Sequence, residues 1–130
     1  MASPDAALIA ALKANAGVSA LAGARVFTAG GQQSASYPYI TVQRISTAGA
    51  SHLTGPNTLE WPRFQIDCWG ETALAAINTA DAVRTAIDNI TVAGSPTITA
   101  TFQDRRGPSP DPDTRNFNVS LDFFIYHERA

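Results

Sequence analysis

The sequence predicts an α+β fold: an antiparallel sheet of about four main strands with two α-helices packed mainly on one face. Three observations support this prediction. Two Ala-rich segments have apolar residues at helical spacing, several segments alternate apolar and polar residues, and turn formers separate the alternating segments. The expected order of elements is α-β-β-β-α-β-β. Strands joined by tight turns form antiparallel sheets, and helices then cover one face.

The first expected helix lies in "SPDAALIAALKANAG", residues 3–17. It begins with a capping hydroxyl, a proline ring already at helical φ and a carboxylate at the positive end of the helix dipole. Its apolar stripe consists of Leu8, Ile9 and Leu12, and Gly17 is a natural end. A short piece with Val18 and Leu21 leads to a brief strand, "ARVFT". Residues 29–36 have the composition of a flexible loop.

A long hairpin follows, made of "YPYITVQRIS" (37–46) and "TLEWPRFQIDCW" (58–69), with the turn formers "TGPN" between them. We expect its distal half, residues 48–59, to extend beyond the sheet. In the second strand, Phe64, Ile66 and Cys68 alternate onto one face, and Gln65, Asp67 and Trp69 take the other. The strand ends at Gly70.

The second half of the chain supplies one helix and two strands. Residues 71–90 carry apolar side chains at helical spacing and begin with Glu71 and Thr72, which suit a helix start. "TITATFQD" (97–104) alternates as a strand. "RRGPSPDPDT" (105–114) is expected to be a loop, because proline cannot donate to a strand ladder. "RNFNVSLDFFIYH" (115–127) is the strongest strand pattern, with Phe117, Val119, Leu121, Phe123 and Ile125 facing the core.

The bulk properties limit the function classes. The chain has 130 residues, and no repeat or boundary divides it, so residues 1–130 are expected to form a single domain. The net charge of −2 argues against tight nucleic-acid binding, which needs a basic excess. Charged residues make up only 15%, which indicates a surface that partners cover, or simply an Ala- and Thr-rich composition.

The expected location is the cytoplasm. One cysteine excludes an internal disulfide and fits a reducing compartment. The N-terminal segment has no basic residue before its apolar stretch, unlike a targeting peptide. No stretch approaches the length of a membrane span, so no membrane partner is expected.

No catalytic, cofactor-binding or metal site is expected, and the chain is not expected to be an enzyme. Cys68 shares a face with core residues, which favours a packed thiol over a nucleophile. Asp67 and Asp122 both point outward and become neighbours if their strands pair, so they are the one candidate for acid–base work. Polar residues are nevertheless normal on a solvated face. His52 and His127 are far apart in sequence and are expected at the surface.

A possible interface is more prominent than any catalytic group. Trp69, Phe124 and Tyr126 end the outward faces of their strands, where aromatic side chains need a cover. Trp61 and Leu53 add apolar surface on the hairpin. Arg105 and Arg106 lie in the Pro-rich stretch from Asp104 to Arg115, whose three acids balance its three arginines, which suits a protein contact or a merely solvated connection. These seven residues are the expected interface.

The order of the segments resembles that of tail completion proteins of tailed phages, a family that includes tail terminators and tail-to-head joining proteins. The resemblance is carried by "SPDAALIAALKANAGVSALAGARVF", "YPYITVQRIS", "RFQIDCWGET" with the following "ADAVRTAI", and "VSLDFFIYH". These segments span nearly the whole chain. Their order, together with the "QIDCW" and "VSLDF" strands, is the specific part of the resemblance.

The resemblance implies a structural virion protein of a phage or prophage. It would form a ring, typically a homohexamer, on the head-proximal end of the tail tube, assembled in the host cytoplasm. The ring would end tube polymerisation and offer a surface to the head-tail connector protein, while DNA passes through its lumen without specific binding. The implied partners are other copies of the chain, the tail tube protein and the connector, with no cofactor.

Two alternatives remain at this point. One is a small intracellular α+β binding or enzymatic module that uses Asp67 and Asp122 in a pocket. The other is a related assembly role: a neighbouring head-tail connector component, or the tail component of a gene-transfer particle or phage-like bacteriocin.

Overall fold

The computed structural model describes residues 4–28, 36–46, 49–52, 55–88, 91–92, 97–110 and 116–128. Within them the elements run in the order α1 (Pro4–Ala14), α2 (Ala16–Ala22), β1 (Val26–Thr28), β2 (Tyr39–Ser46), β3 (Gly49–His52), β4 (Gly55–Glu60), β5 (Arg63–Gly70), α3 (Ala73–Ile87), β6 (Thr91–Val92), β7 (Ile98–Pro110) and β8 (Phe117–Glu128). The α+β class predicted from the sequence is confirmed.

The described strands form one mixed sheet. Its path runs β1-β2-β5-β8-β4-β3, and β7 pairs with the other side of β8 and carries β6. β1 runs parallel to β2, with Val26 opposite Ile40, whereas the other pairs are antiparallel. The expectation of a purely antiparallel sheet is therefore wrong at this edge. The expectation considered strands joined by tight turns, whereas ten residues separate β1 from β2, and parallel neighbours need a longer connection than a tight turn.

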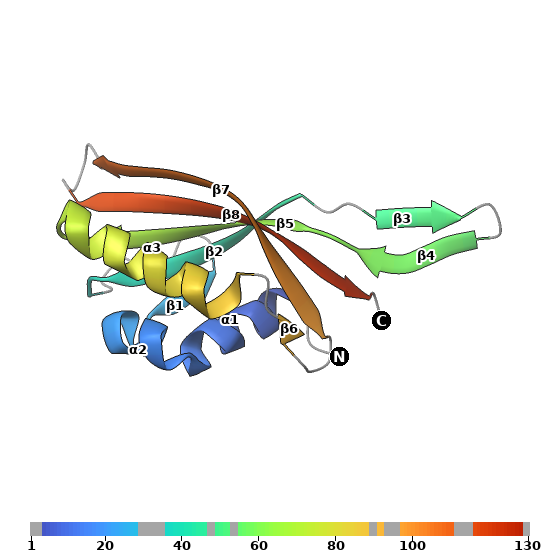
Figure 1. Ribbon diagram of the computed structural model, residues 1–130, viewed down its shortest axis with the longest axis horizontal. Helices are drawn as coiled ribbons and strands as arrows, with labels where there is room; N and C mark the ends of the chain where they lie inside the picture. Colours follow the sequence, from blue (N-terminus) through green and yellow to red (C-terminus); the bar gives the residue numbers. More distant parts are fainter. Residues whose placement is uncertain are drawn as a thin grey trace.

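A single hydrophobic core lies between the sheet and the helices, which share one side of it (Figure 1). The residues predicted to alternate inward, such as Phe64, Ile66 and Phe123, are fully buried there against Leu8 of α1 and Val83 of α3. Each large apolar side chain buried in this way contributes about 1.5–3 kcal/mol. This layer of side chains holds the sheet and helices as one unit.

Side-chain caps decide where two helices begin. Asn15 accepts a hydrogen bond of 3.1 Å from the backbone N–H of Val18. The first helix therefore ends at Ala14, and a second helix, α2, begins after Asn15. This second short helix was not expected as a separate element. Thr72 caps α3 in the same way, through the N–H of Ala75 at 3.1 Å, as its position in the sequence predicted.

The N-terminal helix pair is bent. Among the described helices, none alone is long and apolar enough to cross a membrane, while α1 and α2 together have that length and composition but meet at 82°. Leu8, Leu12 and Val18 of this pair are buried in the core of the domain. An ion pair from Asp5 to Arg44 of β2 also ties α1 to the sheet.

β7 is longer than expected. It continues through the predicted loop as far as Pro110, with Ser109 opposite Asn118 and Pro110 opposite Phe117. The prolines are tolerated because this half of β7 lies at the edge of the sheet, where one side of the strand needs no partner. Irregular pairing between Arg106 and Ser109 accommodates Pro108. Residues 111–115 of the predicted loop lie outside the described residues.

The distal half of the hairpin projects from the body, as predicted (Figure 1). We call this part, β3 and β4, the arm. β2 and β5 pair along most of their length, from Tyr39 opposite Trp69 to Ser46 opposite Arg63. Beyond that point the two strands separate from the sheet and continue as β3 and β4, which pair with each other.

Candidate interface surface

One face of the sheet has no helix on it among the described elements. Because side chains alternate across a strand, the residues between the core positions point to this side. We call it the open face. Its outward residues include Tyr39 and Thr41 of β2, Gln65, Asp67 and Trp69 of β5, and Ser120, Asp122, Phe124 and Tyr126 of β8.

The centre of the open face is a cluster of charged groups around Asp122. The side chain of Asp122 is 0% exposed, and two arginines from neighbouring strands lie over it. Arg63 of β5 donates to its carboxylate at 2.6 Å, and Arg106 of β7 donates at 2.7 and 3.2 Å. Both arginines keep nearly half of their own side chains exposed, 43% and 46%. We call these three residues the Asp122 cluster.

The Asp122 cluster holds its charges firmly. Burial alone would raise the pKa of the Asp122 carboxyl, but the hydrogen bonds and positive charges of Arg106 and Arg63 outweigh burial and lower that pKa below its usual value. The hydrogen bond to Asp122 also raises the pKa of Arg106. Asp122 is therefore a permanent anion at neutral pH, which suits it to hold strands together and not to donate a proton.

Asp67 lies on the same face but has partners of its own. Ser120 donates to it at 2.5 Å, and the amide of Gln65 lies 3.1 Å from each carboxylate oxygen. In the β5–β8 ladder Asp67 is opposite Ser120, and Asp122 is opposite Gln65. The two strands do pair, as the acid–base hypothesis required, but each carboxylate is occupied by hydrogen bonds.

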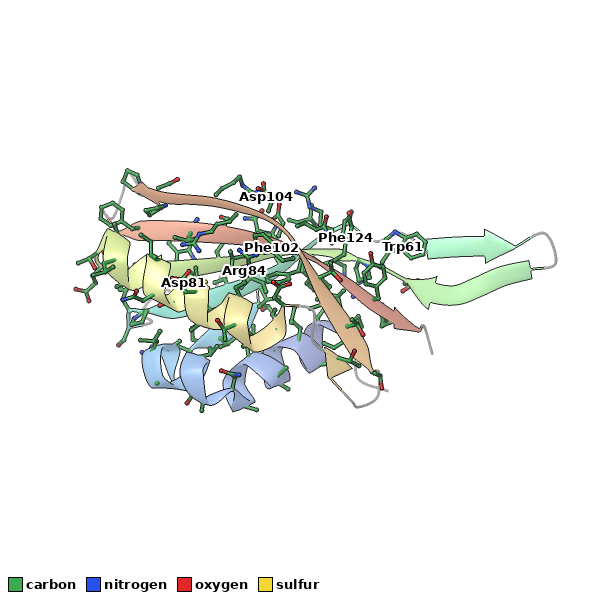
Figure 2. All side chains as sticks on the ribbon, in the orientation of Figure 1. Trp61, Asp81, Arg84, Phe102, Asp104 and Phe124 are labelled. Atoms are coloured by element: carbon green, nitrogen blue, oxygen red, sulfur yellow. The ribbon has the colours of Figure 1, made fainter. Side chains whose placement is uncertain are left out.

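Aromatic residues occupy both ends of the open face. At one end, Trp69 stacks on Tyr39 with ring centres 5.9 Å apart, and its indole N–H donates to Thr41 at 3.3 Å. At the other end, the rings of Trp61 and Tyr126 lie 6.5 Å apart. Figure 2 shows Trp61 where the arm leaves the body. The Asp122 cluster separates these two aromatic groups.

The apolar surface beside the arm is partly exposed to solvent. Tyr126 is 38% exposed and Ile45 of β2 is 43% exposed, while Phe124 and Trp61 are half-buried. Ile45 was not among the residues expected at an interface, nor was Tyr39. Alternation along β2 predicts the position of both: Ile40 and Val42 face the core, so Tyr39 and Ile45, at odd-numbered positions, face the other side. The end of the open face beside the arm is therefore apolar, with Ile45, Trp61, Phe124 and Tyr126 there, whereas Tyr39 lies at the opposite end against Trp69.

Arg105 does not belong to the open face. It points to the helix side, where it donates to Asp81 of α3 at 2.7 Å, while Arg106 reaches Asp122 on the other side of the sheet. A groove of about 410 Å³ lies beside this ion pair, lined also by Arg84, Thr85 and Asp88. Figure 2 shows Arg84 close to Phe102, whose ring centre is 3.8 Å from the guanidinium. Leu53 lies outside the described residues.

The remaining reactive residues are accounted for by packing. Cys68 is fully buried, and burial raises the pKa of its thiol, so it is the core residue that alternation predicted. The expectation of a surface His127 is wrong: its side chain is 4% exposed and lies 3.5 Å from Glu60. The pairing of β8 with β4 covers it, because Glu60 stands opposite His127 in the ladder. Within the described part of the chain, no group of three potential ligands could hold a metal ion.

Comparisons with known proteins agree with this architecture. Residues 6–128 match the family described as "Tail completion protein gp17". A solved structure described as "Virion of native gene transfer agent (GTA) particle" contains a chain with the same fold, at a TM-score of 0.80 and 22% sequence identity. That match covers 97% of this chain and 95% of the other. A search of curated proteins found no significant match.

Proposed function

The chain belongs to the tail completion protein gp17 family, and from this membership we propose that it caps the head-proximal end of a phage tail tube as a homohexameric ring. Membership in this family makes the chain a structural protein of a phage-type tail or head-to-tail region. The structural likeness to a chain of a gene transfer agent virion supports the same class of particle. Family membership argues for a non-enzymatic role.

The observation that carries the ring proposal is the open face. It has no helix cover within the described part, its centre is a fully hydrogen-bonded charged cluster, and its end beside the arm exposes Ile45 and Tyr126. Exposed apolar groups rimmed by polar ones are typical of surfaces that bind another protein. A head-to-tail contact between identical copies closes into a ring when its rotation allows.

The proposed partners follow from the position at the end of a tube. One side of the ring would stack on the tail tube protein and the other would receive the head-tail connector protein, while the ring ends tube polymerisation. The distal half of the hairpin (residues 48–59, which include most of the arm) and residues 104–115 are proposed to contact neighbours or tail partners. The net charge of −2 suits a lumen through which DNA slides without being bound. The protein would assemble in the host cytoplasm and remain in the virion.

All seven residues expected at the interface remain proposed interface residues; Leu53 lies outside the described residues, and the other six have different roles. The two ends of the open face are aromatic: Trp69 lies at one end, and Trp61, Phe124 and Tyr126 lie at the end beside the arm. Arg106 holds the Asp122 cluster, and Arg105 borders the helix-side groove. The enzymatic alternative has less support, because Asp67 and Asp122 are both occupied by hydrogen bonds.

The first experiment measures the mass of the purified protein over a wide concentration range, with electron micrographs of any large species. Closed sixfold rings are expected, either free or on the ends of added tail tubes. The matched variants are Tyr126→Glu, which places a charge on the exposed apolar end of the open face, and Asn78→Glu, which changes an exposed position on α3. Tyr126→Glu should lower ring formation at least tenfold, and Asn78→Glu should leave it unchanged.

The outcomes separate the candidate functions. A chain that stays monomeric at every concentration and never binds tail tubes contradicts the ring proposal. Rings that bind connector particles but not tail tubes would assign the protein to the connector side of the joint instead. If Tyr126→Glu and Asn78→Glu formed rings equally well, the contact between subunits would not lie at the apolar end of the open face.

A further inference from the structure

The arm lacks the support that a β-ribbon needs. It consists of two strands, β3 and β4, and its ladder to the body is short: Leu59 opposite Glu128 and Glu60 opposite His127. An isolated two-stranded hairpin is marginally stable in water, and a third strand or a packed face is needed to hold it. Figure 1 shows no other described element of the chain beside the distal part of the arm.

The free edges of the sheet differ in how well they are protected against pairing. The outer half of β7 carries Asp104, Arg105 and Arg106, then Pro108 and Pro110, and its pairing is interrupted twice. Charges, prolines and bulges of this kind prevent another strand from docking on an edge. The segment from Thr47 to Leu59 contains no Asp, Glu, Lys or Arg. β3, at one end of the sheet path, therefore contains no acidic residue, lysine or arginine, and His52 is its only titratable residue.

A second unprotected edge lies at the opposite end of the same path. β1 is the terminal strand there, pairs only with β2 among the described strands, and consists of Val26, Phe27 and Thr28 without a charged residue. It runs beside the start of β2, whereas the arm follows the end of β2. Figure 1 shows β1 next to the helices and β3 far out on the arm.

We propose that the free edge of β3 pairs with the free edge of β1 in a second copy of this chain, so that each arm adds a strand to its neighbour's sheet. The proposal rests on the ring proposed above and names the contact that closes it. β3 has four residues and β1 has three, so the two edges differ in length by one residue only. Because they lie at opposite ends of one subunit, the contact is head-to-tail and propagates around a ring. Main-chain hydrogen bonds supply the attraction in such strand addition.

Engineered cysteines test this pairing directly. Thr28→Cys is combined with Ser51→Cys in one full-length variant and with Ala50→Cys in another, because adjacent positions point to opposite faces of a strand. Neighbouring strands are about 4.8 Å apart, within the range that a disulfide spans. The single native thiol, Cys68, is fully buried and has a raised pKa, so it does not compete. Mild oxidation of assembled rings is followed on a denaturing gel without reductant.

The expected result is a ladder of covalent multiples up to the full ring in at least one double variant, while each single variant stays at the mass of one subunit. Covalent dimers of the Ser51→Cys single variant would mean that arms pair with each other, and would overturn the proposal. A control pair, Ser51→Cys with Gln103→Cys, reports docking on the β7 edge instead. A ladder from this pair alone would also overturn the proposal.

The same experiment separates this inference from the function on which it rests. Rings that form normally but give no ladder from either Thr28→Cys double variant contradict the β3–β1 contact and leave the ring proposal in place. Absence of rings, both in solution and on tail tubes, contradicts the proposed function itself. Circular dichroism and thermal unfolding of the reduced variants confirm that the substitutions have not changed the fold.

Discussion

Arg106 of the edge strand β7 holds the fully buried carboxylate of Asp122 in the neighbouring strand β8 through two hydrogen bonds of 2.7 and 3.2 Å. Arg63 approaches the same carboxylate from the other side at 2.6 Å. One buried acid therefore links β5, β8 and β7. The free energy of unfolding should therefore depend on the charge of Asp122.

Replacing Asp122 should destabilise the domain. In Asp122→Asn the charge-assisted hydrogen bonds to Arg63 and Arg106 are weakened, and hydrogen bonds to charged groups contribute about 1.5–3 kcal/mol. We expect the free energy of unfolding in urea to fall by about 2 kcal/mol. Asp104→Asn is the control, because Asp104 also pairs with Arg106 but has a side chain that is 59% exposed. Equal losses for the two variants would contradict a special role of burial.

The same carboxyl should make stability depend on acid. The pKa of Asp122 is lower in the folded chain than in the unfolded chain, so its contribution is fully present above the unfolded pKa of about 4 and is lost as the pH falls through the folded pKa. Urea titrations from pH 7 to pH 2 should show the unfolding free energy decreasing below about pH 4. The decrease should be smaller in Asp122→Asn. If the unfolding free energy of the wild-type protein and of Asp122→Asn fell equally with pH, Asp122 would not be the cause of the acid sensitivity.

Gly107 is the position in β7 where a side chain is least tolerated. Its φ is +100°, and a Cβ there would lie 2.5 Å from the carbonyl oxygen of Asn118 in β8. Gly107→Ala therefore combines backbone strain with a clash, at a cost of about 1–3 kcal/mol. Thermal unfolding should show a lower Tm for this variant than for Ser109→Ala, an exposed position two residues further along the strand.

Cys68 should be unreactive until the domain unfolds. Its side chain is fully buried and the pKa of its thiol is raised, and only the thiolate reacts with disulfide reagents. A chromogenic disulfide at pH 8 should release colour from the native protein no faster than global unfolding allows. The same reagent in denaturant should react within seconds. Fast reaction in the native state would also invalidate Cys68 as a silent background for the cross-linking experiment.

Interface variants should avoid Arg106, because this side chain also holds buried Asp122. A variant combining Leu53→Asp with Arg106→Glu is the natural choice from the sequence, but the second change would place a carboxylate against buried Asp122. We expect that variant to lose stability as well as assembly. Ile45→Glu is a cleaner change, because Ile45 is 43% exposed. It should reduce ring formation while leaving the Tm within about 2 °C, since exposed substitutions rarely exceed 0.5 kcal/mol.

Much of the fold could be predicted from alternation and helical spacing. The inward residues Phe64 and Ile66, the outward residue Trp69, the cap at Thr72 and the projecting hairpin all lie where the pattern placed them. These features depend on local sequence, because the pleat of a strand and the period of a helix decide which side chains share a face.

The parts that could not be predicted depend on distant contacts. The parallel pairing of β1 requires knowledge of where the chain returns after residue 28. The opposite directions of Arg105 and Arg106 are set by Asp81 on α3 and Asp122 on β8, which are remote in sequence. His127 is buried because β4 comes back to pair with the end of β8. No pattern within a single segment contains this information.

The arm is inserted between two strands that already pair with each other. β2 and β5 pair from Tyr39 opposite Trp69 to Ser46 opposite Arg63, with one irregularity between Arg44 and Ser46, so the pairing of these two strands does not depend on residues 47–62. Extra or missing residues at such a hairpin tip change loop-closure entropy only slowly. The length and sequence of the arm can therefore change with little effect on the packed body, so the contacts proposed for the arm can be altered separately from folding.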